Sequence, residues 1–318
     1  MTAPAPFFAE IAEVEAPAAC AMLDAGGARV RAAVWTPAGQ GVRGHVLLFP
    51  GRTEYLEKYG RVVARLRAAG FGVASIDWRG QGLSDRDPSV GRLGHVERFA
   101  DFQRDIDALL AWEAVAALPG PRLLLCHSMG GCIGLRALVA GRVAPQAAIF
   151  SAPMWGLALG RVAGLAVRAL ARAAVALGRG RSPTPGDGAD GTYVLDQPFE
   201  GNLLTSDPEH YAWMQAQARA HPELTLAAPT FHWLNEAFRE MRALRRATPP
   251  PVPRLLLLGT DEAIVSAAAI REHAARWPQA ELAELPGARH EGLMESPERP
   301  PGETAWRAME VFLGRHGF

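Results

Sequence analysis

Residues 121–140 read PRLLLCHSMGGCIGLRALVA. The apolar run at the start of this stretch predicts a strand, and the residues from Cys132 to Ala140 predict a helix. A sharp turn with Ser128 at its centre joins them, which is the layout of a nucleophile elbow. Such a turn exposes the serine hydroxyl at the carboxyl edge of a sheet. The backbone N–H of Met129, at the start of the helix, can stabilise a developing oxyanion. We therefore predict that Ser128 is a nucleophile.

One position departs from the G-x-S-x-G pattern of such turns, because Cys126 stands in place of the first glycine. This position needs a small side chain so that the strand and the helix can approach closely, and cysteine is small. A glycine–serine turn without chemical meaning is the alternative interpretation of the same residues.

The composition is ordinary for a globular protein, with 318 residues, 49% of them hydrophobic and 21% charged. This length is enough to bury a large core. A formal net charge of zero argues against nucleic acid or a strongly acidic molecule as a partner. The three cysteines, Cys20, Cys126 and Cys132, do not form a disulfide framework, which indicates a reducing compartment.

No targeting or membrane segment is evident in the sequence. The segment from Met1 to Glu15 has acidic residues and prolines, but not the basic and then apolar pattern of a secretory signal. No apolar run reaches the roughly 18–20 residues that span a bilayer. We therefore expect a cytoplasmic protein.

Short apolar segments alternate with longer helical patterns along most of the chain. The expected strands are residues 30–36, 45–49, 72–77, 122–127, 147–151, 254–259 and 281–285. The expected helices are residues 55–69, 96–117, 129–140, 234–246, 267–277 and 303–315. This alternation predicts an α/β fold with a mostly parallel sheet that helices cover on both faces. Ligands bind beyond the carboxyl ends of such strands, which is where Ser128 lies.

The alternation stops between about Ala152 and Pro229. This stretch has helical patterns and a loop rich in glycine, proline and aspartate at 182–191, but no convincing strand. We predict that it is a helical lid, inserted between two strands and placed over their carboxyl edge. The expected domains are an α/β core at 1–151 and 236–318 and a lid (cap) at 152–235.

A serine nucleophile needs a base, and the base needs a group that orients it. In this architecture the chain order is serine, acid, histidine. His290 is the best base, because it lies in a loop just beyond the expected strand 281–285. The acid should follow strand 254–259, where Asp261 and Glu262 are adjacent candidates. The other histidines after Ser128 lie in the lid or its boundary, in a helical pattern or at the chain end: His210, His221, His232, His273 and His316.

The second oxyanion donor should come from the loop after strand 45–49. Gly51 allows a close backbone approach there, and the N–H of Arg52 would join that of Met129. The Arg52 side chain is expected either to meet charge on a ligand or to pair with Glu54. The turn cluster at 77–84, DWRGQGLS, is expected to be mainly structural. The histidines and cysteines lack metal-ligand spacing and no phosphate-binding loop is present, so we expect neither a metal nor a cofactor.

These residues resemble the serine-dependent α/β-hydrolase superfamily and, more narrowly, its bacterial lysophospholipase and monoacylglycerol lipase branch. The likeness covers most of the chain after about residue 25, and two segments in the lid are more similar to lysophospholipases than to monoacylglycerol lipases. The core segments are 50–54 (PGRTE) with 58–59 (KY), 77–84 (DWRGQGLS), 127–131 (HSMGG), 262–265 (EAIV) and 288–291 (ARHE), and the lid segments are 202–207 (NLLTSD) and 229–233 (PTFHW).

The resemblance implies which carboxylate serves the histidine. Members of this branch usually read acid-x-x-Val, which places Glu262 as the acid with Val265 three residues on. The family's acidic residue after that valine is Ser266 here, and this departure keeps Asp261 open as the alternative acid. Pro50 stands where a histidine is common, as in the lysophospholipase-like members.

The resemblance further implies an α/β-hydrolase fold and a serine hydrolase that cleaves carboxylic esters through an acyl-enzyme. The expected substrates are lysophospholipids or monoacylglycerols. The alternatives are a small-ester carboxylesterase, an aminopeptidase-like hydrolase and a non-catalytic binding protein on the same fold. A peptidase would need acidic lid groups for the substrate amine, and the candidates are Asp187, Asp190, Asp196, Glu200, Asp207 and Glu209.

The lid carries a basic stripe and no acidic residue from Gly156 to Gly180. Its arginines fall on one face of a helix, with leucine, valine and alanine around the rest. A basic amphipathic helix is typical of contact with an anionic lipid surface, so we expect transient contact of the lid with the inner face of the membrane. The alternative is a lid helix whose charged face lies in water. The arginines are Arg161, Arg168, Arg172 and Arg179.

Overall fold

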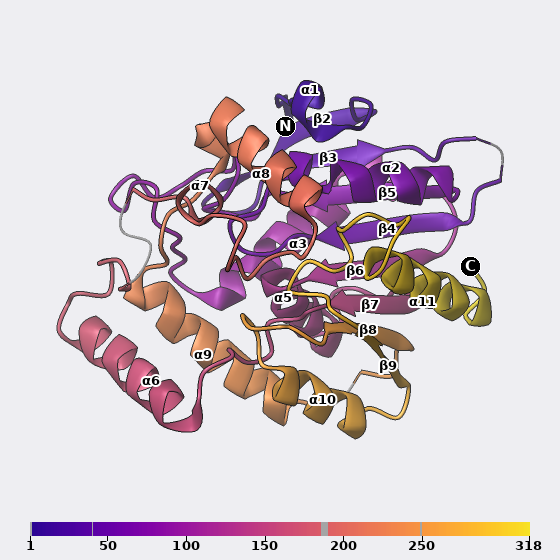
Figure 1. The fold of residues 1–318 in the computed structure, drawn as a ribbon. Helices are drawn as coiled ribbons and strands as arrows, with labels where there is room; N and C mark the ends of the chain where they lie inside the picture. Colours follow the sequence, from indigo (N-terminus) through magenta and orange to yellow (C-terminus); the bar gives the residue numbers. More distant parts are fainter. Residues whose placement is uncertain (1, 40, 186–189, 249) are drawn as a thin grey trace.

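The computed structural model describes residues 2–39, 41–185, 190–248 and 250–318. Within them, the strands are β1 (Ala3–Pro4), β2 (Ala19–Asp24), β3 (Arg29–Trp35), β4 (Gly44–Phe49), β5 (Phe71–Ile76), β6 (Arg122–His127), β7 (Ala147–Ser151), β8 (Arg254–Gly259) and β9 (Ala280–Leu285). They form one sheet in the order β1-β2-β3-β5-β4-β6-β7-β8-β9 (Figure 1). From β5 to β9 every neighbouring pair is parallel, and β1, β2 and β3 are antiparallel additions at one edge.

Helices cover both faces of this sheet. They are α1 (Ala9–Ala12), η1 (Leu56–Tyr59), α2 (Gly60–Ala68), η2 (Phe99–Asp101), α3 (Phe102–Ala111), α4 (Glu113–Ala116), α5 (Met129–Val139), α6 (Arg161–Ala176), α7 (Tyr193–Asp196), α8 (Pro208–Ala220), η3 (Pro222–Leu224), α9 (Phe231–Arg246), α10 (Ala267–Arg276) and α11 (Gly302–Arg315). Side chains of α2 and α11 pack on one face, and those of α3, α5, α9 and α10 pack on the other. The predicted mostly parallel sheet with helices on both faces is confirmed.

Burial on both faces explains why the central strands are apolar throughout. In β8, Leu255 and Leu257 enter the core under α2 and α11, whereas Leu256 and Leu258 enter the core on the opposite face. Side chains alternate between faces along a strand, so a strand covered on both sides needs an apolar residue at every position. The leucine run at 255–258 therefore has the composition of a central strand.

The elements that the sequence analysis missed or merged lie at the periphery. β2 was missed because it is an antiparallel strand near the sheet edge, where only two of its residues, Ala21 and Leu23, are buried. The helix expected at 96–117 is divided into η2, α3 and α4. Trp112, between α3 and α4, has φ −72° and ψ 124°, which is an extended backbone rather than a helical one.

The segment between β7 and β8 contains α6, α7, α8, η3 and α9. α6 lies beside α9, away from the sheet (Figure 1). α9 also packs on α5 of the core. It runs continuously through residue 235, the expected boundary of the lid, and so leads the chain from the inserted segment, which begins after β7, back to the sheet. Among the residues that the structure describes, no helix combines the length and the apolar character needed to cross a bilayer.

Candidate active site

The turn after β6 holds Ser128 in the conformation of a nucleophile elbow. Its backbone has φ 49° and ψ −118°, which is strained for a residue with a side chain. The Ser128 N–H donates to the carbonyl of Ser151 at 3.1 Å, and the Ser128 carbonyl accepts from the N–H of Gly131 at 2.9 Å. The end of β7 and the first turn of α5 therefore hold the strained residue in place.

α5 approaches the sheet so closely that two of its positions require glycine. A Cβ atom on Gly130 would lie 2.1 Å from the carbonyl oxygen of Phe49, and one on Gly134 would lie 2.4 Å from Sγ of Cys126. Gly134 on α5 therefore leaves room for the side chain of Cys126, which stands in place of the first glycine of the G-x-S-x-G pattern.

Three side chains from three loops form a hydrogen-bonded line. His290 Nε2 lies 2.8 Å from Ser128 Oγ, and His290 Nδ1 lies 2.8 Å from Glu262 Oε2. Ser128 follows β6, Glu262 follows β8 and His290 follows β9, so parallel strands bring the three residues to one edge of the sheet. This geometry allows the imidazole to take the serine proton while the carboxylate orients the ring.

Of the two candidate acids, Glu262 contacts His290, and Asp261 lies exposed. Glu262 Oε1 accepts the backbone N–H groups of Ile264 and Val265 at 2.7 and 3.0 Å. Burial by itself would raise the pKa of this carboxyl. The hydrogen bond and charge of His290 and the two amides outweigh burial, so the pKa of Glu262 lies below its usual value. Glu262 is therefore a carboxylate at neutral pH.

The other histidines after Ser128 have different surroundings. His210 contacts Glu291, His221 contacts Glu10 and Glu223, His232 contacts the carbonyl of Glu97, His316 contacts Glu281, and His273 is buried against Trp155 and Trp277.

The loop at residues 50–54 lies against the elbow. A Cβ atom on Gly51 would lie 3.1 Å from Cβ of Ser128. The Gly51 N–H donates to the Glu54 carboxylate, and the Thr53 N–H donates to Gln81 Oε1 at 2.8 Å. Because the amides of Gly51 and Thr53 make these bonds, neither is expected to be an oxyanion donor. This supports the prediction that the backbone N–H of Arg52 is the donor from this loop.

The Arg52 side chain turns toward the inserted segment. Its guanidinium lies 5.5 Å from the ring of Trp233, and one of its nitrogens donates to the carbonyl of Ala227 at 3.3 Å. Glu54 was an expected partner of the Arg52 side chain. In the structure it pairs with Lys58 instead, at an Nζ–Oε1 distance of 2.9 Å.

A buried cluster of charged side chains joins the 50–54 loop to the loop of His290, and sequence reasoning missed it. Lys58 Nζ lies between Glu54 and Glu291, 2.6 Å from Glu291 Oε1. The other oxygen of Glu291 lies 2.9 Å from His210 Nε2 on α8. The one available signal was the Glu54–Lys58 spacing of four residues, which suits a helical ion pair but does not predict Glu291 as a third member.

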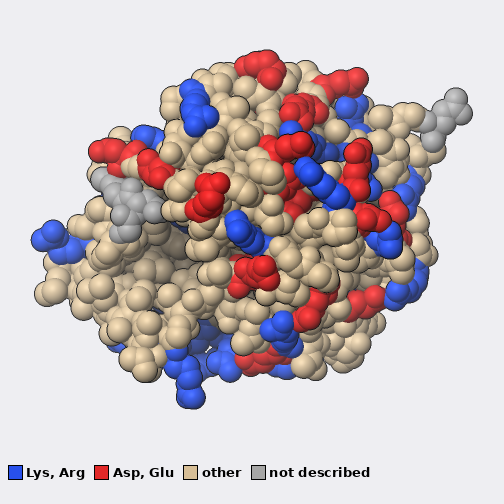
Figure 2. All heavy atoms as spheres, in the orientation of Figure 1, with Lys and Arg blue, Asp and Glu red and all other residues tan. Residues whose placement is uncertain are grey.

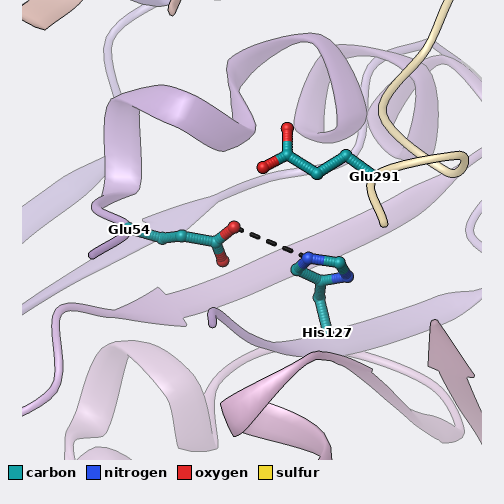
Figure 3. Close-up of side chains that lie close together, drawn as sticks. All are labelled: Glu54, His127 and Glu291. Carbon is teal, nitrogen blue, oxygen red and sulfur yellow. Dashed lines mark ion pairs between the residues drawn. The ribbon is translucent and has the colours of Figure 1, made fainter. Parts of the chain in front are cut away.

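Figure 3 shows Glu54, His127 and Glu291 gathered around this point, with His127 Nε2 3.6 Å from Glu54 Oε1. Burial lowers the pKa of His127 to about 4. Burial alone would raise the pKa of Glu291, but the charge of Lys58 and the contact with His210 hold it well below its usual value. The spacing of the three side chains would suit a metal ion. The Lys58 ammonium already supplies a positive charge between the two carboxylates.

A cavity of about 330 Å³ opens in front of Ser128. Its walls are mainly apolar. Figure 2 shows a hollow in the surface of the molecule between the positions of α7 and α9. The inserted segment supplies Met214, Leu226 and Trp233 to the lining, and the core supplies Ser128 and His290. A concave, apolar cavity with a few converging polar groups is typical of a small-molecule site.

Residues 40–297 match the protein family described as serine aminopeptidase, S33. The chain is 34% identical over 226 residues to lysophospholipase L2 of Escherichia coli (strain K12), an alignment that spans 69% of this chain and 64% of the E. coli protein. It is also 37% identical over 108 residues to monoacylglycerol lipase of Mycolicibacterium smegmatis (strain ATCC 700084 / mc(2)155), spanning 34% of this chain and 36% of that protein.

The fold is similar to that of a soluble variant of monoglyceride lipase from Saccharomyces cerevisiae, solved with a substrate analog. The TM-score is 0.74 at 22% sequence identity, and the match covers 99% of this chain and 100% of that chain. The expected α/β-hydrolase fold is thereby confirmed.

Proposed function

Because the chain belongs to the serine aminopeptidase S33 family of α/β hydrolases, we propose that it is a serine ester hydrolase that acts on lysophospholipids or monoacylglycerols. The observation that supports this most directly is the line from Ser128 through His290 to Glu262, with 2.8 Å at each step, at the head of an apolar cavity.

In the first half of the reaction, His290 Nε2 takes the proton of the Ser128 hydroxyl as its oxygen attacks the ester carbonyl. The backbone N–H groups of Arg52 and Met129 stabilise the tetrahedral oxyanion. Each such donor contributes roughly 3–4 kcal/mol in comparable sites. Glu262 holds the ring and stabilises the imidazolium. The intermediate collapses as the imidazolium protonates the leaving alcohol, and Ser128 retains the acyl group.

In the second half, water replaces the alcohol. His290 takes a proton from the water as its oxygen attacks the acyl carbonyl, and the same oxyanion donors serve again. The imidazolium then returns the proton to Ser128, and the carboxylic acid leaves. No metal or cofactor is required at either stage.

The cavity supports a substrate with an acyl chain. Leu157, Met214 and Trp233 line the same cavity as Ser128 and offer apolar contact to such a chain. Two relatives with matching sequence are named lysophospholipase L2 and monoacylglycerol lipase. An acyl chain in this cavity places its ester at the serine, and Thr192 and Thr225 add polar groups to a lining that is mainly apolar.

The lining gives little support to an aminopeptidase. A free amine needs a carboxylate, and the cavity-lining carboxylates Glu54 and Glu291 already share Lys58. None of the described acidic residues of the insertion lines the cavity, and Asp187 lies outside the described residues. The described ones are Asp190, Asp196, Glu200, Asp207, Glu209 and Glu223.

We further propose that a cytoplasmic enzyme of this kind meets its substrate at the inner face of the membrane through α6. Val162 and Leu165 are 82% and 65% exposed, and Arg161 and Arg172 are exposed beside them. The only buried side chains of α6 are the small ones of Ala171 and Ala174. The surface over α6, at the lower left of Figure 2, is mostly uncharged with arginines at its edge. Arg179 lies beyond the end of the helix.

A panel of esters tests the substrate class. We expect kcat/KM on long-chain lysophosphatidylcholine or monoacylglycerol to exceed that on acetyl and butyryl esters. An aminoacyl amide serves as the control substrate and should be hydrolysed far more slowly. A profile that peaks at acetate would favour a small-ester carboxylesterase, and preferred cleavage of the amide would favour a peptidase.

A further inference from the structure

We propose that Gln81 is a positioning residue for the oxyanion hole, because its side-chain amide fixes the direction of the Arg52 N–H. The inference rests on the proposed function of the Ser128 site. Gln81 lies in the turn cluster at 77–84, which the sequence analysis treated as mainly structural. It touches no substrate and acts through the backbone of the 50–54 loop.

The Gln81 amide bonds both peptide groups that flank Arg52. Its Nε2 donates to the Gly51 carbonyl at 3.1 Å, and its Oε1 accepts from the Thr53 N–H at 2.8 Å. A primary amide has one donor group and one acceptor, so this pairing uses the two ends of the side chain in the orientation that their chemistry requires.

The bond to Gly51 determines where the Arg52 N–H points. The Gly51 carbonyl and the Arg52 N–H belong to one peptide group, and in a planar trans peptide the C=O and N–H bonds point in opposite directions. A carbonyl held toward Gln81 therefore turns the Arg52 N–H away from Gln81. Rotation of this peptide would break the bond to Nε2 and swing the N–H out of position.

Ser128 lies next to the 50–54 loop, and both face the cavity. Arg52, Thr53 and Ser128 line the cavity, whereas Gln81 is not among the described residues that do so. Gln81 is 4% exposed, and its amide is buried against the backbone of the 50–54 loop. Its amide thus acts as a buried support at the back of the loop, and the Arg52 N–H is presented at the front.

The turn that carries Gln81 is itself tightly packed and hydrogen-bonded. Gly80 and Gly82 have φ 80° and 51°, and a Cβ atom on Gly82 would lie 2.0 Å from the carboxylate of Asp77. Asp77 Oδ2 accepts the Leu83 N–H at 2.9 Å, which closes the turn around Gln81. Trp78 Nε1 also donates to the Pro50 carbonyl at 2.9 Å, so the same turn holds the start of the 50–54 loop.

The Thr53 backbone needs this support. Thr53 has φ 62°, in the left-handed region that a β-branched residue rarely occupies. The bond from its N–H to Gln81 Oε1 holds it there. Glutamate at position 81 would keep this acceptor but would lose the donor to Gly51, and methionine would lose both.

The experiment compares wild type with Gln81→Met and Gln81→Glu on one ester substrate. The readouts are kcat, KM and the Ki of a trifluoromethyl ketone, whose serine adduct carries an oxyanion. We expect kcat to fall by about tenfold to a hundredfold, less than the 10²–10³ of a lost oxyanion donor. We expect Ki to rise in the same proportion while KM stays within about twofold, since only the oxyanion is affected.

Ser84→Ala is the matched control. The Ser84 hydroxyl donates to the Asp77 carbonyl at 2.6 Å and accepts from the Arg31 N–H at 2.8 Å in the same buried turn. This variant should lower Tm without changing kcat or Ki per folded molecule. If Gln81→Met does not fold, Gln81→Glu, which keeps the acceptor to Thr53, carries the comparison.

A Gln81→Glu variant with the kcat and Ki of wild type would overturn the inference, and so would a loss of activity that only tracks the loss of folded protein. A wild-type protein that hydrolyses none of the esters and takes up no ketone would instead refute the proposed function. Activity in wild type together with unchanged Gln81 variants would refute only the role of Gln81.

Discussion

The ammonium group of Lys58 lies 2.6 Å from the carboxylate of Glu291, the residue that follows His290. Lys58 also contacts Glu54, which holds the Gly51 N–H in the loop of the proposed oxyanion donor. The two loops that must close around the reacting carbonyl are therefore joined beneath the site by one cation. A buried cation of this kind stabilises the structure only while its partners are present.

Replacing Lys58 with methionine leaves two carboxylates buried without their cation. We expect Lys58→Met to lower the free energy of unfolding by about 3–5 kcal/mol, as for other broken buried pairs. Urea denaturation measures it. Arg307→Met, which breaks an ion pair with Glu303 at a 72% exposed position, is the control and should change stability by less than about 1 kcal/mol. Equal effects of the two substitutions would contradict the account.

The acid of the site is tested by two conservative substitutions. Glu262→Gln retains the shape of the side chain but loses the charge that faces His290 at 2.8 Å, so kcat should fall by about 10²- to 10⁴-fold. Asp261→Asn alters an exposed side chain and should leave kcat within about twofold. Steady-state kinetics on one ester compares them, and a larger loss in Asp261→Asn would reverse the assignment.

Acid stability should depend on His273. Burial between Trp155 and Trp277 lowers the pKa of His273 to about 4, whereas the unfolded chain has its ordinary value near 6.5. Between these values the unfolded state binds more protons. The contribution of neutral His273 is therefore fully present above pH 6.5 and is lost as the pH falls toward 4.

His273→Phe removes this titration and keeps an aromatic ring in the same place. Between pH 7 and pH 5, wild type should lose about 1–2 kcal/mol more stability than the variant. Urea denaturation at both pH values measures the difference. Identical pH dependence in the two proteins would show that His273 does not titrate as described.

Much of the α/β core was predictable, because the sequence patterns that indicate it are short and local or follow from the order of the strands. The leucine run of β8 indicates a strand buried on both faces, and Ser128 lies in a turn whose pattern is contiguous. His290 was selected as the candidate base by its place after β9 in the required chain order, and the structure places it in contact with Ser128. Each of these inferences needs only a short window and the rule that parallel strands end at one edge.

The parts that were missed depend on contacts between distant segments. Lys58 and Glu291 are 233 residues apart, and Gln81 reaches Gly51 across 30 residues. No periodicity links such positions, because side-chain hydrogen bonds do not repeat along the chain. The prediction of one continuous helix at 96–117 was wrong because the extended backbone of Trp112 interrupts a pattern that is otherwise helical.

Membrane contact through α6 is tested with a double variant. Val162→Glu with Leu165→Glu replaces two exposed apolar side chains, so binding to anionic phosphatidylglycerol vesicles should fall by about tenfold or more. Val311→Glu, at a 49% exposed valine on α11, is the matched control and should bind as wild type does. Co-sedimentation measures the bound fraction. Equal binding of all three proteins would exclude α6 as the contact.

Labelling with a fluorophosphonate probe followed by mass spectrometry identifies the nucleophile, which we assign as Ser128. We expect one probe adduct per chain, located on Ser128, together with complete loss of both labelling and ester hydrolysis in a folded Ser128→Ala variant. An adduct on another residue, or ester hydrolysis by Ser128→Ala at the wild-type rate, would contradict this assignment.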